Sequence, residues 1–259
     1  MPNRKFVVPR TTTSTRKPVL YFATVLAVVT GAVAPVTAQA QAATDIYKRM
    51  TDVYSYAKSY QGTINRIEKG KTPNGKSGSQ TLTVKISFKA PNKYVVESKK
   101  SINLGGQSES SLQVVVADSK GLFVCSPDKK EYQHGPVQNE NLLSRFFAQL
   151  NPMNGFLLLP EATVNGRPAF VLKPNLPAKG TPEQLANAKK LKIVIAIDKQ
   201  NYQLLRLTIE SPNGYLTETV SGQTVNGAIP DSLFVWTPPA GYKEIKAPTT
   251  QVPGKAPVQ

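Results

Sequence analysis

The chain has 259 residues, which is enough for one large domain or two small ones, and 40% of them are hydrophobic. That apolar content supports a packed core and excludes global disorder. Lysine and arginine number 32 against 16 acidic residues, so the formal net charge is +16. A single cysteine excludes an internal disulfide framework, and a single histidine excludes metal sites built from histidine clusters.

The N-terminal segment has the pattern of a cleaved secretory signal. Basic residues without any acid precede an apolar run over 19–34, and small residues alternate from there up to Ala42. The run is shorter than the ~20 residues that a membrane-spanning helix needs, although an uncleaved anchor is the alternative. We therefore predict a signal peptide over 1–42 and a soluble mature chain that starts near Gln41 or Ala43. The protein would be exported to the periplasm or the extracellular side of the envelope.

The basic composition indicates anionic partners for an exported protein. Lipid headgroups, acidic wall polymers and acidic proteins all fit this charge, whereas export argues against nucleic acid. Cys125 lies in an apolar run and is interpreted as a small buried hydrophobe. A reactive thiol is the alternative, but no histidine lies near it in sequence to activate it.

The mature chain opens with a predicted helix. Thr44 is a suitable N-cap, Gly62 would end the helix, and apolar residues recur between them at intervals of three and four. These positions are Ile46, Met50, Val53, Ala57 and Tyr60.

Most of the remaining chain alternates apolar and polar residues, which predicts β-strands. The predicted strands cover 82–88, 94–99, 112–116, 122–125, 131–134, 162–164, 169–172, 191–198, 204–210, 215–224 and 233–237. Asn165-Gly166 is a strong hairpin signal, and Thr181-Pro182-Glu183 opens a short helix within an inserted loop over 174–190. About ten antiparallel strands predict one large curved sheet or barrel rather than a parallel α/β fold. The Pro-rich tail over 246–259 is expected to be disordered.

The alternation also predicts which side chains face inward, because a sheet with one buried face has to sort them by period two. The expected inward set is Leu82, Val84, Ile86, Phe88, Leu112, Val114, Val116, Ile193, Ile195, Leu205 and Leu207.

A second predicted helix, over 141–150, carries a wide apolar stripe. The stripe consists of Leu142, Leu143, Phe146, Phe147 and Leu150, and the apolar run 156–159 follows soon after it. Met153 begins a joint between the two, and methionine adapts to irregular apolar surfaces. The helix is either permanent core or a lid that moves over a lipid cavity.

Four stretches, in order, resemble the LolA family of periplasmic lipoprotein carriers and its LolA-like relatives. They cover 86–94, 116–127, 195–214 and 229–241. The first pairs a strand with Lys89-Ala90-Pro91 and an aromatic strand, and the second resembles the family's Asp-Gly, aromatic, Tyr-x-Pro hairpin. The fourth ends in Pro238-Pro239-Ala240-Gly241, like the family's Pro-Pro-x-Gly, and is the most specific of the four.

The resemblance implies a mainly β domain over 43–245: an unclosed antiparallel half-barrel, capped by helices over an apolar cavity that accepts acyl chains. All the inward residues above except Leu112 would line that cavity, and Leu142, Leu143, Phe146, Phe147, Leu150 and Met153 would form the lid. In carriers of the family, an arginine directly before the proline holds the lid closed. The residue there is Ala90, so we do not transfer that latch to this chain.

The expected function is that of a carrier or binder of a lipid or lipoprotein acyl chain. An inner-membrane donor, an outer-membrane acceptor and transient contact with an anionic membrane surface are the partners that this implies. The alternative is an envelope sensor or interaction protein that uses the same fold to bind a protein or another anionic partner. No cofactor, metal or enzymatic activity is expected, because the acidic residues fall at turns and strand ends, where turn chemistry accounts for them.

Overall fold

The computed structural model describes residues 36–71, 77–118, 120–137, 142–147, 155–175 and 181–246. They belong to one compact unit that spans Ala34–Gln259. The predicted signal peptide up to residue 35 and the predicted tail from residue 247 lie outside the described residues, and so do Leu150 and Met153.

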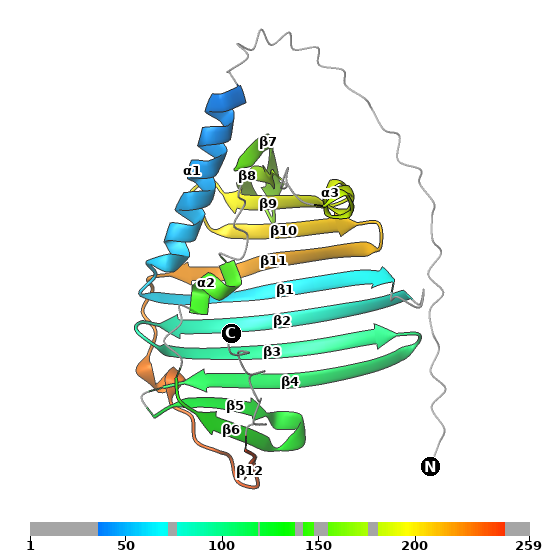
Figure 1. Cartoon of the computed structure of the whole chain (residues 1–259). Coiled ribbons are helices and arrows are strands. Elements are labelled where there is room, and N and C mark those ends of the chain that lie inside the picture. The colour runs from blue at the N-terminus through cyan, green and yellow to red at the C-terminus, as the bar shows by residue number, and fades with distance from the viewer. Residues whose placement is uncertain are drawn as a thin grey trace, which may run out of the picture. The chain divides into compact units, whose positions relative to one another are not determined.

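Twelve strands form one sheet in the order β12-β6-β5-β4-β3-β2-β1-β11-β10-β9-β8-β7 (Figure 1). Neighbouring strands are antiparallel except for the pair β12 and β6. The strands are β1 (Ser59–Lys71), β2 (Ser77–Lys89), β3 (Lys93–Leu104), β4 (Gln107–Ala117), β5 (Leu122–Ser126), β6 (Glu131–Gly135), β7 (Phe156–Val164), β8 (Arg167–Pro174), β9 (Lys192–Asp198), β10 (Leu204–Ser211), β11 (Gly214–Val225) and β12 (Lys243–Glu244). Strands β7 and β12 stand at opposite edges, so the sheet is not closed. This confirms the predicted mainly β, unclosed antiparallel architecture.

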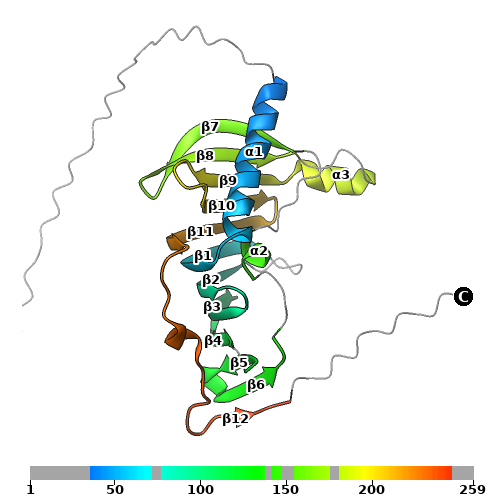
Figure 2. The ribbon, with the colours of Figure 1, turned by 90° about the vertical axis from the view of Figure 1, so that its left-hand side faces the viewer.

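Three helices accompany this sheet. They are α1 (Val36–Ser55), α2 (Leu142–Phe147) and α3 (Pro182–Lys189), with 3₁₀ turns at Pro127–Lys129 and Asp231–Phe234. In Figures 1 and 2, α1 and α2 lie over one side of the sheet, and the segment that follows β11 runs along the other side. No helix within the described residues is long and apolar enough to cross a membrane.

The first helix differs from its prediction at both ends. Thr44 is not a cap, because its hydroxyl donates to the carbonyl oxygen of Ala40 (3.0 Å) inside the helix. The helix ends at Ser55, and Ala57 and Tyr60 lie beyond it, the latter in β1. Tyr60 continues the helical spacing only by coincidence, since a buried aromatic residue fits the inner face of a strand equally well. The buried face of α1 is formed by Ala43, Tyr47, Met50 and Tyr54.

The final predicted strand, over 233–237, is also wrong. Residues 231–234 form a 3₁₀ turn that buries Phe234, and Trp236 packs its ring against Phe123 (centroids 5.0 Å apart) and Tyr132 (5.3 Å). Proline before and after this segment removes backbone donors that a sheet ladder needs. The segment therefore covers the outer face of β5 and β6 instead of extending the sheet. Beneath it Cys125 is buried, as predicted, and burial raises the pKa of its thiol.

A buried hydrogen-bond network joins α1 to the sheet. The Tyr54 hydroxyl accepts from the backbone N–H of Leu204 (2.9 Å) and donates to Oε1 of Gln223 (2.7 Å). The amide of Gln223 in turn donates to the carbonyl oxygen of Leu204 (2.8 Å). Burial raises the pKa of Tyr54, so the hydroxyl stays neutral and keeps its proton for Gln223. This network fixes the C-terminal end of α1 over β10 and β11.

Replacing Tyr54 with phenylalanine is expected to lower the free energy of unfolding by about 1–3 kcal/mol, because a buried backbone donor loses its partner. Urea denaturation measures the change. The matched control is Tyr56→Phe, two residues further along, where the side chain is 78% exposed and no change is expected. Equal urea midpoints for the two variants would contradict a structural role for the network.

Candidate functional site

A cavity of about 310 Å³ lies between the helices and the inner face of the sheet. Its walls come from α1 and α2, and its floor comes from β1, β9, β10 and β11. The lining residues are Tyr47, Met50, Arg66, Phe146, Phe147, Ile195, Leu204, Leu207, Ile209, Leu216 and Glu218. Apart from one arginine and one glutamate, this lining is aliphatic and aromatic, so the cavity suits a hydrocarbon ligand.

Some of the residues that were predicted to line the cavity do lie in its lining or next to it. Ile195 and Leu207 line the cavity directly, and they are cross-strand partners. Ile193 is the partner of Ile209, which also lines it. On β2, Val84, Ile86 and Phe88 are buried in the adjoining core, with Leu82 packed against them at its edge. A ligand-binding role for these residues stays a prediction.

The expected register of β4 is wrong. Val115 packs against the inner core and pairs with Val96, whereas Val116 pairs with Val95 and Phe123 on the opposite face. By alternation, Leu112 and Val114 lie on that outer face as well. The physical reason is that the outer face is also covered here, because Trp236 packs on Phe123. Both faces of this part of β4 therefore carry apolar residues.

Leu205 is a second correction, and a β-bulge causes it. Leu204 pairs with Ile197 and Arg206 pairs with Ala196, so Leu205 is the extra residue between them. A bulge reverses the alternation that follows it. Leu204 and Leu207 consequently face the cavity, while Leu205 packs outside with Val164, Ala169 and Ala196 in a separate small cluster.

The two neighbouring rows of the predicted lid have different environments. Leu143 and Phe147 are buried in the core, and the Phe147 ring stacks on Tyr54 with centroids 3.9 Å apart. Leu142 and Phe146 are only partly buried, and Phe146 lines the cavity. The apolar run 156–159, which the sequence joined to the lid, belongs to edge strand β7 instead. Whether α2 moves stays a prediction.

Sequence reasoning missed the two charged residues of the cavity. Arg66 and Glu218 are cross-strand partners on β1 and β11, and they form an ion pair in which Nε and Nη2 of Arg66 donate to Oε1 of Glu218. The Glu218 side chain is 9% exposed and that of Arg66 is 34% exposed. β1 was not predicted, because Tyr60 at its start continues the spacing of the predicted helix and the charged Arg66 interrupts its apolar alternation.

The strand tips beside the cavity are hollowed. A row of cross-strand partners, Gly78, Gly70 and Gly214, leaves the inner face without side chains there. Glycine is required at Gly70, because a Cβ would come within 2.9 Å of the carbonyl oxygen of Asn213. One of these hollows, of about 360 Å³, shares Ile209 and Leu216 with the cavity, so the cavity continues toward the tips.

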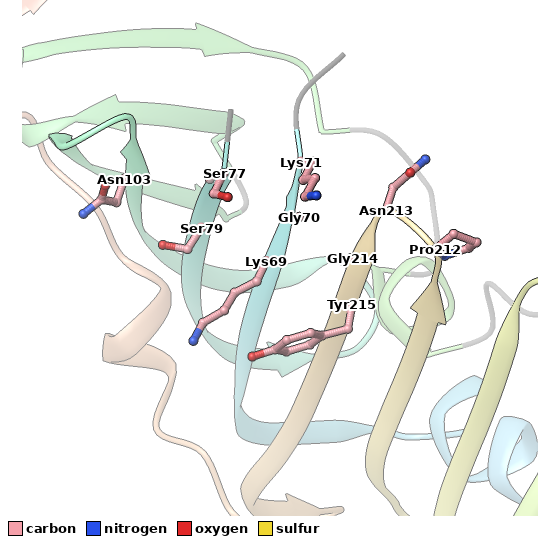
Figure 3. Close-up of a pocket in the computed structure, with 11 residues that line it drawn as sticks. Lys69, Gly70, Lys71, Ser77, Ser79, Asn103, Pro212, Asn213, Gly214 and Tyr215 are labelled. Carbon is pink, nitrogen blue, oxygen red and sulfur yellow. The ribbon is translucent and has the colours of Figure 1, made fainter. Parts of the chain in front are cut away.

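Another hollow at the tips has a polar lining. It measures about 630 Å³ and is lined by Lys69, Ser79, Asn103 and Tyr215 among others. Figure 3 shows Lys69 and Tyr215 side by side on one face of the sheet, in agreement with their cross-strand pairing. The side chains that line this hollow carry ammonium, amide and hydroxyl groups, whereas those that line the cavity are mainly hydrocarbon.

No family model matches the chain, and no curated protein matches it at a significant level. Several solved structures are similar in fold. The crystal structure of LprF from Mycobacterium bovis has a TM-score of 0.47 at 8% identity and covers 73% of this chain and 95% of that one. The lipoprotein LppX from Mycobacterium tuberculosis has a TM-score of 0.41 at 14% identity, covering 73% and 98%.

A LolA superfamily protein from Nitrosomonas europaea has a TM-score of 0.30 at 11% identity, covering 75% of this chain and 97% of that one. LolA superfamily structures are thus among those to which this chain is similar, and its unclosed antiparallel sheet is the architecture that the four stretches implied. Because each of these TM-scores is below 0.5, we take nothing about ligand or partner from these proteins.

Proposed function

We propose that the protein is an exported carrier that shields an acyl chain in the cavity between α1, α2 and the sheet. The observation that carries this proposal is the cavity itself, about 310 Å³ in volume and lined mainly by aliphatic and aromatic side chains. Transfer of each methylene from water into such a lining is favourable by ~0.8 kcal/mol.

The route into the cavity supports the same proposal. The hollow that shares Ile209 and Leu216 with the cavity runs to the strand tips, where the glycine row leaves the surface open. An acyl chain can lie along this path with its tail in the cavity and its polar end outside. Without the five basic residues of the predicted signal peptide, 27 basic against 16 acidic residues leave a net charge of +11, which favours transient contact with an anionic membrane surface. Transfer of a lipoprotein from an inner-membrane donor to an outer-membrane acceptor is the finer form of this proposal.

The proposal is tested by uptake of a fluorescent fatty-acyl probe by the mature protein, with native mass spectrometry of protein purified from its own envelope to detect bound lipid. Leu207→Trp is expected to abolish uptake, because the larger ring fills the cavity that Leu207 lines. The matched control is Thr208→Trp, on the same strand with its side chain on the opposite face. If the unmodified protein takes up no probe and carries no lipid, the carrier function is wrong and the interaction-protein alternative replaces it.

A further inference from the structure

The cavity contains an ion pair at a position where hydrocarbon would be expected. Arg66 and Glu218 stand in one cross-strand row on the inner face of the sheet, between Leu82 on one side and Leu207 on the other. Both charged residues line the cavity. The cross-strand pair Lys85 with Glu97 is far more exposed, at 61% and 42%. Arg167 with Asp198 is as deeply buried, at 36% and 2%, but it lies outside the cavity lining, and Asp198 also accepts hydrogen bonds from the backbone of the turn that follows it.

A structural role alone does not account for the pair. Taking two charges out of water costs several kcal/mol per ion, and replacing a buried pair by apolar residues of similar volume is often neutral or stabilising. Leucine or methionine at both positions would continue the apolar row formed by Leu82 and Leu207. The pair therefore needs a second explanation, and its place in the cavity lining points to the ligand.

The geometry of the pair leaves hydrogen-bond donors available. Nε and Nη2 of Arg66 both donate to one oxygen of Glu218, Oε1. Among the described residues Arg66 pairs with Glu218 alone, through Nε and Nη2, so its Nη1 amino group has no acceptor among them. Since Arg66 lines the cavity and is one third exposed, these donors are accessible to a bound molecule.

We propose that Arg66 donates a hydrogen bond to the carbonyl oxygen of an ester-linked acyl chain, and that Glu218 both orients Arg66 and excludes free fatty acids. This rests on the proposed function and names its ligand class. A carbonyl oxygen satisfies the free guanidinium donors without adding charge. An alkyl group provides no acceptor, an ether oxygen is a weaker acceptor than an ester carbonyl, and a carboxylate brings a second negative charge next to Glu218 where solvent screens it poorly.

The test compares ligands that differ only at the linkage. Displacement of the fluorescent acyl probe from the mature protein is measured with dioctanoyl phosphatidylcholine and with its dioctyl ether analogue, which has the same headgroup and chain length. A hydrogen bond to a charged donor predicts that the diester binds at least about tenfold more tightly. Methyl octanoate is likewise expected to bind more tightly than octanoate.

Two variants test whether these ligand preferences come from the Arg66–Glu218 ion pair. Arg66→Met/Glu218→Leu removes both charges together, so no unpaired charge remains, and it is expected to bind the diester and the diether equally well. Glu218→Gln keeps a hydrogen-bond acceptor for Arg66 but removes the negative charge, so it is expected to tighten octanoate binding at least about tenfold while the preference for the diester stays.

Equal affinities of the unmodified protein for the diester and the diether would overturn the inference while the carrier function stands. So would a diester preference that survives in the double variant. If neither lipid displaces the probe and the probe itself does not bind, the proposed function fails together with the inference.

Discussion

Phe147→Glu is expected to unfold the domain, whereas Phe146→Glu is expected to leave it folded and to abolish acyl uptake. The two residues are neighbours on α2 but have different surroundings. Phe147 is 4% exposed and packs against Tyr54 and Tyr60, with ring centroids 3.9 and 5.4 Å away. An unpaired carboxylate there costs several kcal/mol, a large part of the 5–15 kcal/mol that stabilises a typical domain.

Phe146 is only partly buried and borders the cavity, so a carboxylate at this position can stay hydrated. It would nevertheless place a charge where the hydrocarbon tail has to lie. Thermal unfolding followed by circular dichroism separates the two variants by stability, and probe uptake separates them by function. If Phe146→Glu unfolds the protein as Phe147→Glu does, then α2 is permanent core and the lid hypothesis is wrong.

Arg66→Met is expected to destabilise the protein by about 3 kcal/mol, whereas the double variant Arg66→Met/Glu218→Leu is expected to be about as stable as the original chain. The single change leaves Glu218, the more deeply buried partner, as an unpaired charge. The double change removes that penalty and continues the apolar row. Glu218→Leu alone is expected to cost less than Arg66→Met, because a guanidinium that is one third exposed still contacts water.

Urea denaturation of the four proteins gives the coupling free energy of the pair directly. A double variant that is as unstable as Arg66→Met would show that the ion pair is needed for the fold. The lipid comparison proposed for Arg66 would then have no stable charge-free reference, and a structural role would account for the pair without a ligand.

Local patterns in the sequence determine much of the fold. Asn165 and Gly166 form the predicted hairpin turn with φ angles of 52° and 77°, because both residue types tolerate the left-handed region that a type I′ turn requires. The alternation of β2 and β9 places Val84, Ile86, Ile195 and Ile197 in the core. In β2 a single face is apolar, so the period of two specifies the register. In β9 both faces are apolar, and the larger isoleucines occupy the inner face while Ala196 packs on the outer one.

Only the tertiary structure decides the remainder, because the missing information comes from distant parts of the chain. The three consecutive valines 114–116 fit either face, and the C-terminal segment that covers their outer face is remote in sequence. The bulge at Leu205 depends on how β10 pairs with β9. Arg66 and Glu218 are 152 residues apart and look like two surface charges until β1 and β11 pair. The apolar lining of the candidate site was therefore predictable from the sequence, but its Arg66–Glu218 ion pair was not. A charged residue can be identified as buried only when the residue that pairs with it is known.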